Sequence, residues 1–523
     1  MRTIATEDTA IPTPPLALVP LDDRPCNRQF PSQLAEIVGL ELHQPPREAL
    51  GWFTTPGNCE AIAAWLRESP AAHLVLSLDM LCYGGLVASR APETGAGTAL
   101  ARLEGLRALK QARPDLIIFA SSVIPRLGLT VAAAGDLRSH QDLIAYATHA
   151  ASAGRGDRLV QLGEPDPAAE VEAIAARLDP QVLTRYLAVR ERNHAVSRRA
   201  VELVAEGVLA YLLVVQEDAA PEGLHVAEQE DLRQLTAARG VGDRVELHPG
   251  ADEAGLVLLA RHCSLASGAP PRLCADYASD QASRGIPLYE DRPLRDTVLG
   301  TLRAAGAQAV PPMQAEAMMF VHTPLGDQRE ASEAPPQGHS PSVAMQAESI
   351  VERLHFATEA GGIAGIADVM YANGGDPELI AALERSAAGK KLRAYAGWNT
   401  ASNTVGTVVA QLCLEALAAR EKRPVVSRRF LACRLADDYG YQTVVRPQAI
   451  QKAAALNADQ FALGAATPQL EEHVRARLLP VAESALFGVL GAPLRDLGPE
   501  LKVSLPWRRL FEVEVEIPPA AAP

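Results

Sequence analysis

Short apolar runs that end on polar residues are the feature of this sequence that most constrains its fold. Eight such runs occur, and helix-period segments separate most of them. They are Leu16–Leu21, Leu74–Leu78, Leu116–Ala120, Tyr211–Val215, Arg272–Ala275, Ala317–Val321, Ile363–Ala367 and Leu392–Ala396. Because the runs are apolar without alternation, they predict parallel strands that helices cover on both faces.

The strand count leaves two α/β architectures open. Eight strands match a (β/α)8-like barrel, in which active sites gather at the carboxyl ends of the strands. A doubly wound parallel sheet, or two of them, places its ligands at the same ends. In either fold, the residues that directly follow the strands are the ones to search for function.

Patterning divides the chain into a large α/β catalytic domain and smaller parts. The helical pattern from Leu127 to Leu209 is longer than one crossover requires, which predicts a helical insertion that includes an N-cap at Asp179-Pro180. The predicted parts are an N-terminal tail (1–15), the α/β domain (16–420) with its insertion (127–209) and a polar loop (326–343), and a mainly helical C-terminal subdomain (421–523).

Charge and cysteine usage narrow the class of protein. The 523-residue chain has 49 basic and 63 acidic residues, a net charge of −14, which argues against nucleic-acid and membrane-surface partners. The seven cysteines are scattered without a CxxC pair, a usage typical of the reducing cytoplasm. The sequence shows no signal peptide and no apolar stretch near the roughly 20 residues that span a membrane.

Several cofactor motifs are missing. The sequence has no GxGxxG after a strand, no GxxxxGK[ST], no GxSxG and no HExxH, and its twelve histidines are dispersed. We therefore expect no cofactor and no histidine-rich zinc site. A hard cation such as Mg²⁺ stays open as an alternative, because four acids near strand ends could converge on it. These are Asp22, Asp79, Asp276 and Asp368.

The strongest catalytic candidates are two adjacent acids after the fourth run. Glu217 and Asp218 follow an apolar strand, where burial would raise the pKa of one acid while its neighbour stays ionised. That difference suits a general acid beside a charge stabiliser. Asp79, after the second run, is a third catalytic candidate. In contrast, Asp252 and Glu253 precede a helical run, and we interpret them as first-turn acids that interact with the helix dipole.

Substrate-binding candidates cluster after the other runs. Trp398 lies among amides and hydroxyls in an aromatic-poor chain, a combination that suits a sugar, whose C–H faces pack on the ring. Thr400 or Ser402 would equally serve as a helix N-cap there. The predicted binding residues are Asp22, Asp23, Arg24, Arg126, Asp276, Asp280, Tyr289, Asp368, Asn373, Trp398, Asn399 and Asn403.

Five segments together resemble a bacterial family described as domain of unknown function 4127. They are LVPLDDRPCN, LDMLCYGGL, ADYASDQ, ANGGD and AYAGWNTASNT, and the resemblance covers nearly the whole chain. It implies one functional unit and supplies no catalytic residues. A second resemblance is architectural. In barrel glycosidases that use substrate assistance, two adjacent acids follow the fourth strand, as Glu217 and Asp218 follow the fourth run here.

These observations support three hypotheses. The first is a cytoplasmic glycoside hydrolase of the β-N-acetylhexosaminidase kind, which acts on a small carbohydrate by a substrate-assisted or two-carboxylate mechanism. The second is a metal-assisted hydrolase or lyase that uses the four-acid cluster named above. The third is a non-catalytic protein that binds a sugar or another metabolite.

Overall fold

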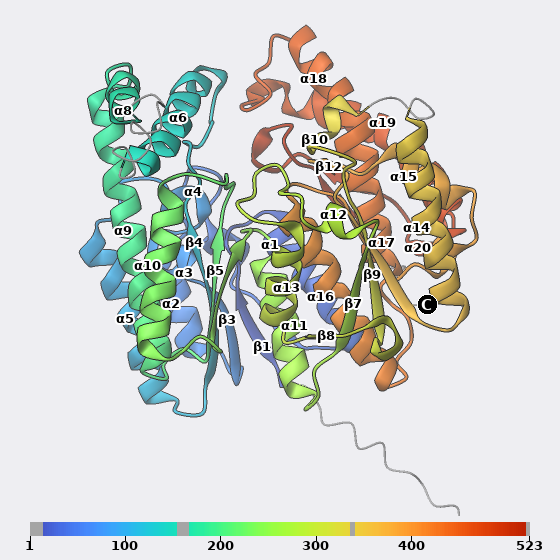
Figure 1. Ribbon diagram of the computed structural model, residues 1–523, viewed down its shortest axis with the longest axis horizontal. Helices are drawn as coiled ribbons and strands as arrows, with labels where there is room; N and C mark the ends of the chain where they lie inside the picture. Colours follow the sequence, from blue (N-terminus) through green and yellow to red (C-terminus); the bar gives the residue numbers. More distant parts are fainter. Residues whose placement is uncertain (1–13, 154–166, 335–339, 519–523) are drawn as a thin grey trace, which may run out of the picture.

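Six parallel strands from the first half of the chain form the first of two open sheets in this computed structural model, which describes residues 14–153, 167–334 and 340–518 (Figure 1). In order across the sheet they are β2 (Leu42–His43), β1 (Leu16–Val19), β3 (His73–Ser77), β4 (Ile117–Ile124), β5 (Tyr211–Gln216) and β6 (Val245–Pro249). The strand order reverses direction between β1 and β3. Doubly wound folds bind their ligands beside such a point, outside the carboxyl ends of the strands.

The second half of the chain repeats this design with five parallel strands. In order they are β13 (Ala394–Ala396), β11 (Ile363–Asp368), β9 (Ala317–His322), β7 (Arg272–Tyr277) and β8 (Gln308–Ala309). Two small ribbons complete the strands. A parallel one joins β10 (Arg329–Glu330) to β12 (Tyr371–Ala372), and an antiparallel one joins β14 (Lys502–Ser504) to β15 (Glu514–Glu516).

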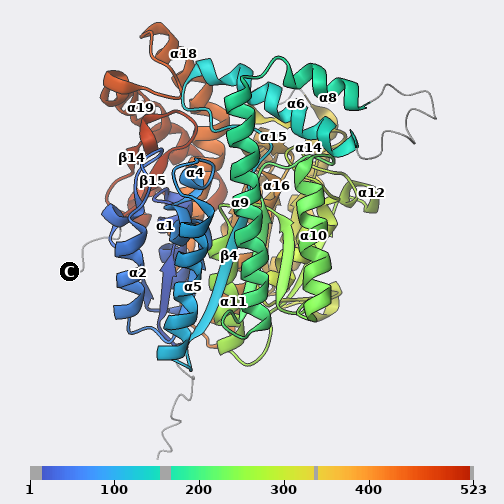
Figure 2. The same cartoon turned by 90° about the vertical axis from the view of Figure 1, so that its left-hand side faces the viewer.

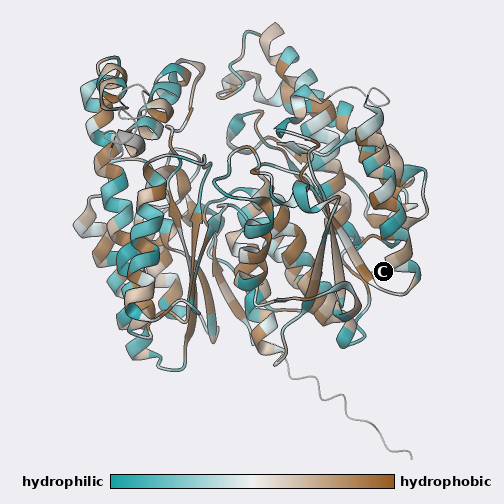
Figure 3. Ribbon diagram, viewed as in Figure 1, coloured by the Kyte–Doolittle hydropathy of each residue, from teal (hydrophilic) through white to brown (hydrophobic). Residues whose placement is uncertain are grey.

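Strand alternation explains how helices cover both faces of each sheet. In β1, Leu16 and Leu18 point into the core between the two sheets, whereas Ala17 and Val19 point into the core on the outer face. The apolar colour of the strands in Figure 3 reflects this burial on both sides. The layer between the sheets contains α1 (Pro25–Ala35), α11 (Ala254–Ala266), α13 (Leu294–Ala304) and α16 (Ala401–Arg420).

Further helices cover the outer faces. On the first sheet these are α2 (Cys59–Glu68), α3 (Leu78–Tyr83), α5 (Ala96–Ala112), α9 (Pro180–Ala205) and α10 (Leu224–Arg239). The second sheet shares a hydrophobic core with α14 (Pro341–Glu359), α15 (Pro377–Glu384), α17 (Arg428–Arg434), a π-helical segment (Leu435–Val445), α18 (Arg446–Ala455), α19 (Thr467–Ala485) and α20 (Leu494–Leu497). Two short helices complete the layers. Helix α4 (Leu86–Ser89) comes after β3 and α3 in the first half of the chain, and α12 (Asp280–Ser283) comes after β7 in the second half.

All eight apolar runs form strands, and the open-sheet alternative describes how they assemble. The first four runs belong to the first sheet and the last four to the second, so the strands do not close into a single barrel. Three strands of the two sheets, β2, β6 and β8, do not correspond to any predicted run. The longest of them, β6, alternates Glu246 and His248 with apolar residues at the edge of its sheet, so it lacks the continuous apolar run that marks its neighbours.

Two helical regions lie beyond the carboxyl ends of the strands (Figure 2). The predicted insertion contains α6 (Leu137–Ala153) and α8 (Pro167–Ala175), and α9 begins as expected at Asp179, whose side chain accepts a hydrogen bond from the backbone N–H of Gln181. The C-terminal part shares its hydrophobic core with the second sheet. The two regions touch where Asp459 accepts a hydrogen bond from the backbone N–H of Ala134 (2.9 Å). Residues 1–13 of the predicted tail, 154–166 of the insertion, 335–339 of the polar loop and the C-terminal 519–523 lie outside the described residues.

Candidate active-site cleft

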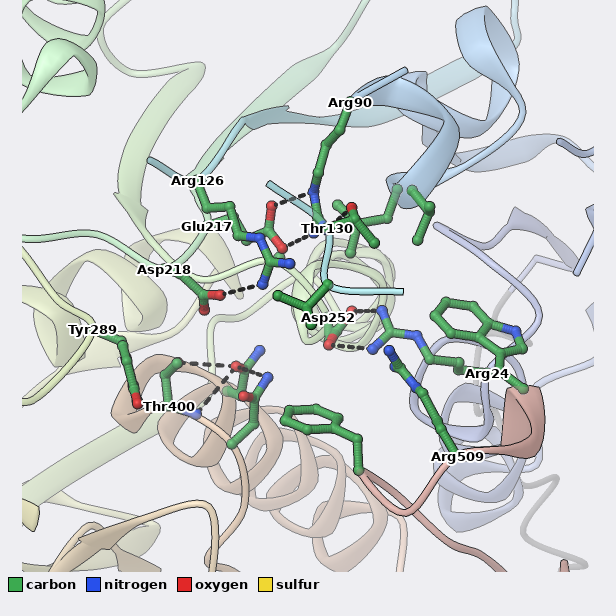
Figure 4. A pocket seen from close by; sticks show the side chains of 18 of the residues that line it. Arg24, Arg90, Arg126, Thr130, Glu217, Asp218, Asp252, Tyr289, Thr400 and Arg509 are labelled. Atoms are coloured by element: carbon green, nitrogen blue, oxygen red, sulfur yellow. Dashed lines mark hydrogen bonds and ion pairs between the residues drawn. The ribbon is translucent and has the colours of Figure 1, made fainter. Parts of the chain in front are cut away.

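A cleft of about 330 Å³ opens at the carboxyl ends of the first sheet, beside the point where its strand order reverses. Loops after β1, β4, β5 and β6 supply Arg24, Arg126, the pair Glu217 and Asp218, and Asp252 (Figure 4). The second half of the chain contributes Tyr289, Asn399, Thr400 and Asn403, and the C-terminal segment contributes Phe461, Trp507, Arg509 and Phe511. We call this cavity the main cleft.

Glu217 and Asp218 each face an arginine in the main cleft. Arg90 binds both carboxylate oxygens of Glu217, one of them at 3.1 Å from Nε, and also donates to the Thr130 hydroxyl (2.9 Å). Arg126 binds Asp218 at 3.0 Å. The structure thus gives each acid its own guanidinium, whereas we expected burial to raise the pKa of one acid while its neighbour stays ionised. The pairs differ in access, because the Glu217 side chain is 7% exposed and that of Asp218 33%.

Asp252 is a cleft residue that the sequence analysis assigned to a helix dipole. Its carboxylate forms two hydrogen bonds with the Arg24 guanidinium (2.5 and 3.1 Å), and Arg24 binds Asp22 as well (2.7 and 2.9 Å). Asn27 donates to both acids. Burial raises the pKa of Asp252, and Arg24 opposes that rise. The correction has a simple cause: the partner of Asp252 lies 228 residues away in the chain.

The C-terminal segment supplies the aromatic wall that the sequence analysis placed elsewhere. Trp507 lies beneath Arg24 and Arg509, whose guanidinium carbons are 4.9 and 4.6 Å from a ring centroid. The indole N–H donates to Asp23 (2.7 Å). Sequence reasoning missed Trp507, Arg509 and Phe511, which carry no strand-end signal. An indication was available in Trp507 itself, one of only four tryptophans, set in the polar sequence PWRRLFEVE.

Left-handed backbone conformations concentrate around the cleft. Asp218 (φ 33°), Tyr289 (φ 67°), Asn399 (φ 51°) and Trp507 (φ 54°) all line it. A non-glycine residue with positive φ costs on the order of 1 kcal/mol or more, and such residues persist where the surroundings hold them. The loops thus present these side chains at a cost to backbone stability, a pattern that clusters at functional sites.

Four of the predicted binding residues lie close together in the structure: Tyr289, Asn373, Asn399 and Asn403. The Asn399 side-chain amide donates a hydrogen bond to the Asn403 side chain (2.8 Å). The backbone carbonyl of Asn399 accepts a hydrogen bond from the backbone N–H of Asn373 (2.8 Å). Tyr289 and Asn373 both donate to Glu330, at 2.5 and 2.9 Å. The alternative role of Thr400 also holds. It is the N-cap of α16, and its hydroxyl donates to Asn403 (2.9 Å).

Buried carboxyl groups lie below the floor of the cleft. Glu253 is fully buried, and one of its oxygens accepts hydrogen bonds from Asn403 (2.5 Å) and from the backbone N–H of Ala251 (3.0 Å). Burial raises the pKa of Glu253 to about 8. Nearby, Glu290 accepts from the backbone N–H of Ser402 (2.6 Å), and burial raises its pKa to about 7. These acids fix the first turn of α16, which bears Asn403.

Other predicted residues lie apart from the main cleft. Asp79 is buried and accepts the backbone N–H of Val123 (2.9 Å), and burial raises its pKa to about 7. Asp276 pairs with Arg353 (2.5 Å), and the exposed Asp280 pairs with Arg284 (2.7 Å).

Two further candidates stand behind the residues that line the cleft. Asp22 holds Arg24, and Asp23 holds Trp507 and Arg47 (3.3 Å). Each therefore supports a cleft residue without lining the cavity itself.

Trp398 does not form the open platform that we predicted for it. Its ring packs edge-on against Phe30 (5.8 Å, 74°), and its indole N–H donates to Thr407 (3.1 Å). It borders a small cavity of about 30 Å³, next to Arg24 and Asn399. Trp507, although largely buried, is the tryptophan that lines the main cleft.

Asp368 belongs to a sealed network at the carboxyl ends of the second sheet. It accepts hydrogen bonds from the Tyr395 hydroxyl (3.1 Å) and the backbone N–H of Asp376 (2.7 Å), and Asp376 binds His322 (2.7 Å). The neighbouring acid Asp438 binds Arg434 (2.7 Å). The pKa of Asp368 is raised to about 6 and that of Asp438 to about 8, chiefly by burial.

The four acids that we considered as cation ligands do not converge. Each of Asp22, Asp79, Asp276 and Asp368 has a different set of protein partners, as described above. Within residues 14–153, 167–334 and 340–518, no group of three or more His, Cys, Asp or Glu side chains has the arrangement of a metal site. All seven cysteines are buried and unpaired. Among the helices of the described residues, none is both long and apolar enough to cross a membrane.

Comparison with known proteins identifies the family of this chain. No curated protein sequence and no solved structure is significantly similar to this chain. The model of a family described as "Protein of unknown function (DUF4127)" matches residues 16–516, which include both sheets and every cleft residue named above, and the chain belongs to that family.

Proposed function

We propose that the main cleft is the active site of a glycoside hydrolase that acts on a small carbohydrate, with a β-linked N-acetylhexosamine as the favoured substrate class. The observation that carries the proposal is the meeting of carboxylates with amides and a phenol in one cavity. Glu217, Asp218 and Asp252 come from the first sheet, and Asn399 and Tyr289 face them from the second half of the chain. Sugars are recognised by such groups, and carboxylates carry out most glycosidic hydrolysis.

The difference in exposure assigns the two adjacent acids. Asp218 is the more exposed acid, so it contacts the substrate and stabilises positive charge that develops at the anomeric carbon or orients the acetamido group. Glu217 is buried against Arg90 and is a positioning residue. Asp252 lines the cleft beside them and is the proton donor to the leaving oxygen once the substrate separates it from Arg24, which binds both of its oxygens in the free protein. The enzyme acts in a reducing cytoplasm, a location supported by its seven unpaired cysteines.

Four arginines favour a second candidate function. Arg24, Arg90, Arg126 and Arg509 all line the main cleft, and guanidinium groups recognise carboxylates and phosphates. A protein that binds a small acidic metabolite without transforming it would use these four arginines to bind the acid. It would not require a proton donor. In both functions the ligand is a small molecule.

Hydrolysis of a panel of 4-nitrophenyl glycosides tests the proposal, with both N-acetylhexosaminides and a glucuronide included. We expect release of nitrophenol from one sugar, unchanged by EDTA. Release that EDTA abolishes would replace the carboxylate mechanism with a metal-assisted one. No release, together with a rise in melting temperature when acidic metabolites are added, would favour the binding function.

A further inference from the structure

We infer that the main cleft continues into a second binding chamber that takes an apolar group of the same ligand, so that the substrate is an amphipathic glycoside with an apolar aglycone. Only the identification of this ligand as a glycoside rests on the proposed function. The chamber itself rests on geometry alone. It has a volume of about 580 Å³ and shares Arg126, His140, Asp218, Tyr289, Asn399 and Phe511 with the main cleft.

The lining of this side chamber differs from that of the main cleft. Beyond the shared residues, most of its lining is aliphatic, with Leu127 and Ile144 from the insertion region, Ala219 and Ala220 after β5, and a loop of the second half of the chain. Its polar lining residues are Glu290, Asp327, Gln328 and Asn373. That loop contributes Ile286, Pro287 and Leu288. By contrast, three guanidinium groups besides that of Arg126 line the main cleft.

Exposure indicates that the aliphatic wall is open to a ligand. The Ile286 side chain is 45% exposed, and Ile144, Ala220 and Leu288 are partly exposed. Removing apolar surface from water contributes roughly 25 cal/mol per Å² to the free energy of binding. A hydrocarbon group that covers this wall therefore binds favourably. Ligand pockets commonly combine such walls with a few polar groups that fix orientation.

The shared residues determine how the ligand lies. Asp218 and Arg126 stand at the boundary, with their 3.0 Å ion pair facing both cavities. A glycoside that spans this boundary places its sugar among the carboxylates and amides of the main cleft and its aglycone against the aliphatic wall. The scissile bond then lies beside Asp218, the acid that the proposed function assigns to the anomeric carbon.

Binding of 2-naphthoate, measured by isothermal titration calorimetry, tests the chamber without any need for catalysis. This probe joins an apolar double ring to one carboxylate that can face Arg126. We expect one saturable site and a negative heat-capacity change, the mark of apolar burial, whereas acetate should bind at least tenfold more weakly. Equal binding of acetate and 2-naphthoate, or no binding of 2-naphthoate, would overturn the inference.

Variants locate the site. Ala220→Trp fills the chamber and should weaken 2-naphthoate binding at least tenfold, and Leu187→Trp adds the same ring at an exposed position of α9 that does not line the chamber. If Ala220→Trp does not fold, Ile144→Gln makes the wall polar and should weaken binding several-fold. Unchanged affinity in a folded Ala220→Trp or Ile144→Gln variant would place the probe elsewhere and contradict the inference.

The hydrolysis panel separates failure of the chamber from failure of the proposed function. If the protein hydrolyses no glycoside but binds 2-naphthoate, and Ala220→Trp abolishes that binding, the binding chamber is supported and the glycosidase function is rejected. Hydrolysis with the same kcat/KM for 4-nitrophenyl and methylumbelliferyl glycosides in wild type and Ala220→Trp would retain the glycosidase and reject the chamber.

Discussion

The two sheets carry similar polar groups at their carboxyl ends but use them differently. After the first sheet, Asp218 and Arg126 form an ion pair whose side chains are 33% and 19% exposed at an open cleft. After the second sheet, Asp438 and Arg434 form an ion pair whose side chains are 0% and 1% exposed. Asp218 follows β5, and Asp368, which lies in the same network as Asp438, ends β11, so sequence position alone does not separate a ligand site from a structural network.

The comparison also shows how a perturbed pKa can mislead. Asp438 and Asp368 have strongly raised pKa values, a property that often marks active sites. Here burial produces the rise, and both acids already accept hydrogen bonds from protein donors. Access to a cavity, together with strained backbone at Asp218 and Asn399, is the better guide to function in this fold.

The largest expected effect is on folding and comes from the sealed network. Arg434 binds Asp437 and Asp438 and lies over the Phe30 ring at 3.7 Å. Arg434→Met leaves two buried acids without their cation, so we expect a loss of about 3–5 kcal/mol in the free energy of unfolding, measured by urea denaturation. The exposed pair of Arg475 with Glu472 provides the control, and Arg475→Met should cost less than about 0.5 kcal/mol. A loss below about 1 kcal/mol in Arg434→Met would show that the network is not structural.

Glu217→Gln should affect both folding and function, because Glu217 is buried and adjoins the cleft. Loss of the charged hydrogen bonds to Arg90 should cost about 1.5–3 kcal/mol in unfolding free energy. Misplacement of Arg90 and Asp218 should also lower kcat/KM roughly 100-fold. Glu228→Gln removes a similar partner from the buried Arg190, outside the main cleft. It should match the stability loss and retain activity, and equal activity loss in both variants would remove the special role of Glu217.

Glu253 should make stability depend on pH. Its pKa in the folded protein is about 8, above the ordinary value of 4.5, so between these values the folded protein holds a proton that the unfolded chain has lost. Stability therefore falls as pH rises from about 4.5 to 8, by up to about 1.4 kcal/mol per pH unit from this group. Glu253→Gln should flatten that slope, as measured by urea unfolding at pH 5.5 and 8. The same slope in variant and wild type would contradict the assignment.

The smallest effect is expected at Asp280, a predicted binding residue that the structure places outside the cleft. Its side chain is 73% exposed and pairs with Arg284. Asp280→Asn should change the unfolding free energy by less than about 0.5 kcal/mol and kcat/KM by less than twofold. A tenfold loss of activity would instead move the functional site to the loops after β7.

Local patterns predicted the strands and half of the site. Each of the eight apolar runs forms a strand of one of the two sheets. The acids after the fourth run reach the cleft because the carboxyl ends of parallel strands meet at one edge of the sheet. Asp252 and Trp507 could not be found this way, because their partners Arg24 and Asp23 are more than 200 residues away. Trp398 was misjudged for the same reason, since only the folded structure shows that Phe30 of α1 packs against its ring in the loop before α16.

The central claim is that the open acids act on a substrate whereas the sealed acids hold the fold. Hydrolysis of the best nitrophenyl glycoside by Asp218→Asn tests it most directly, because the partial exposure of this acid lets the variant fold. We predict that kcat/KM falls at least 100-fold, about 2.7 kcal/mol of transition-state stabilisation, with unfolding free energy within about 1 kcal/mol of wild type. A folded Asp218→Asn variant that keeps kcat/KM within threefold of wild type would contradict the claim.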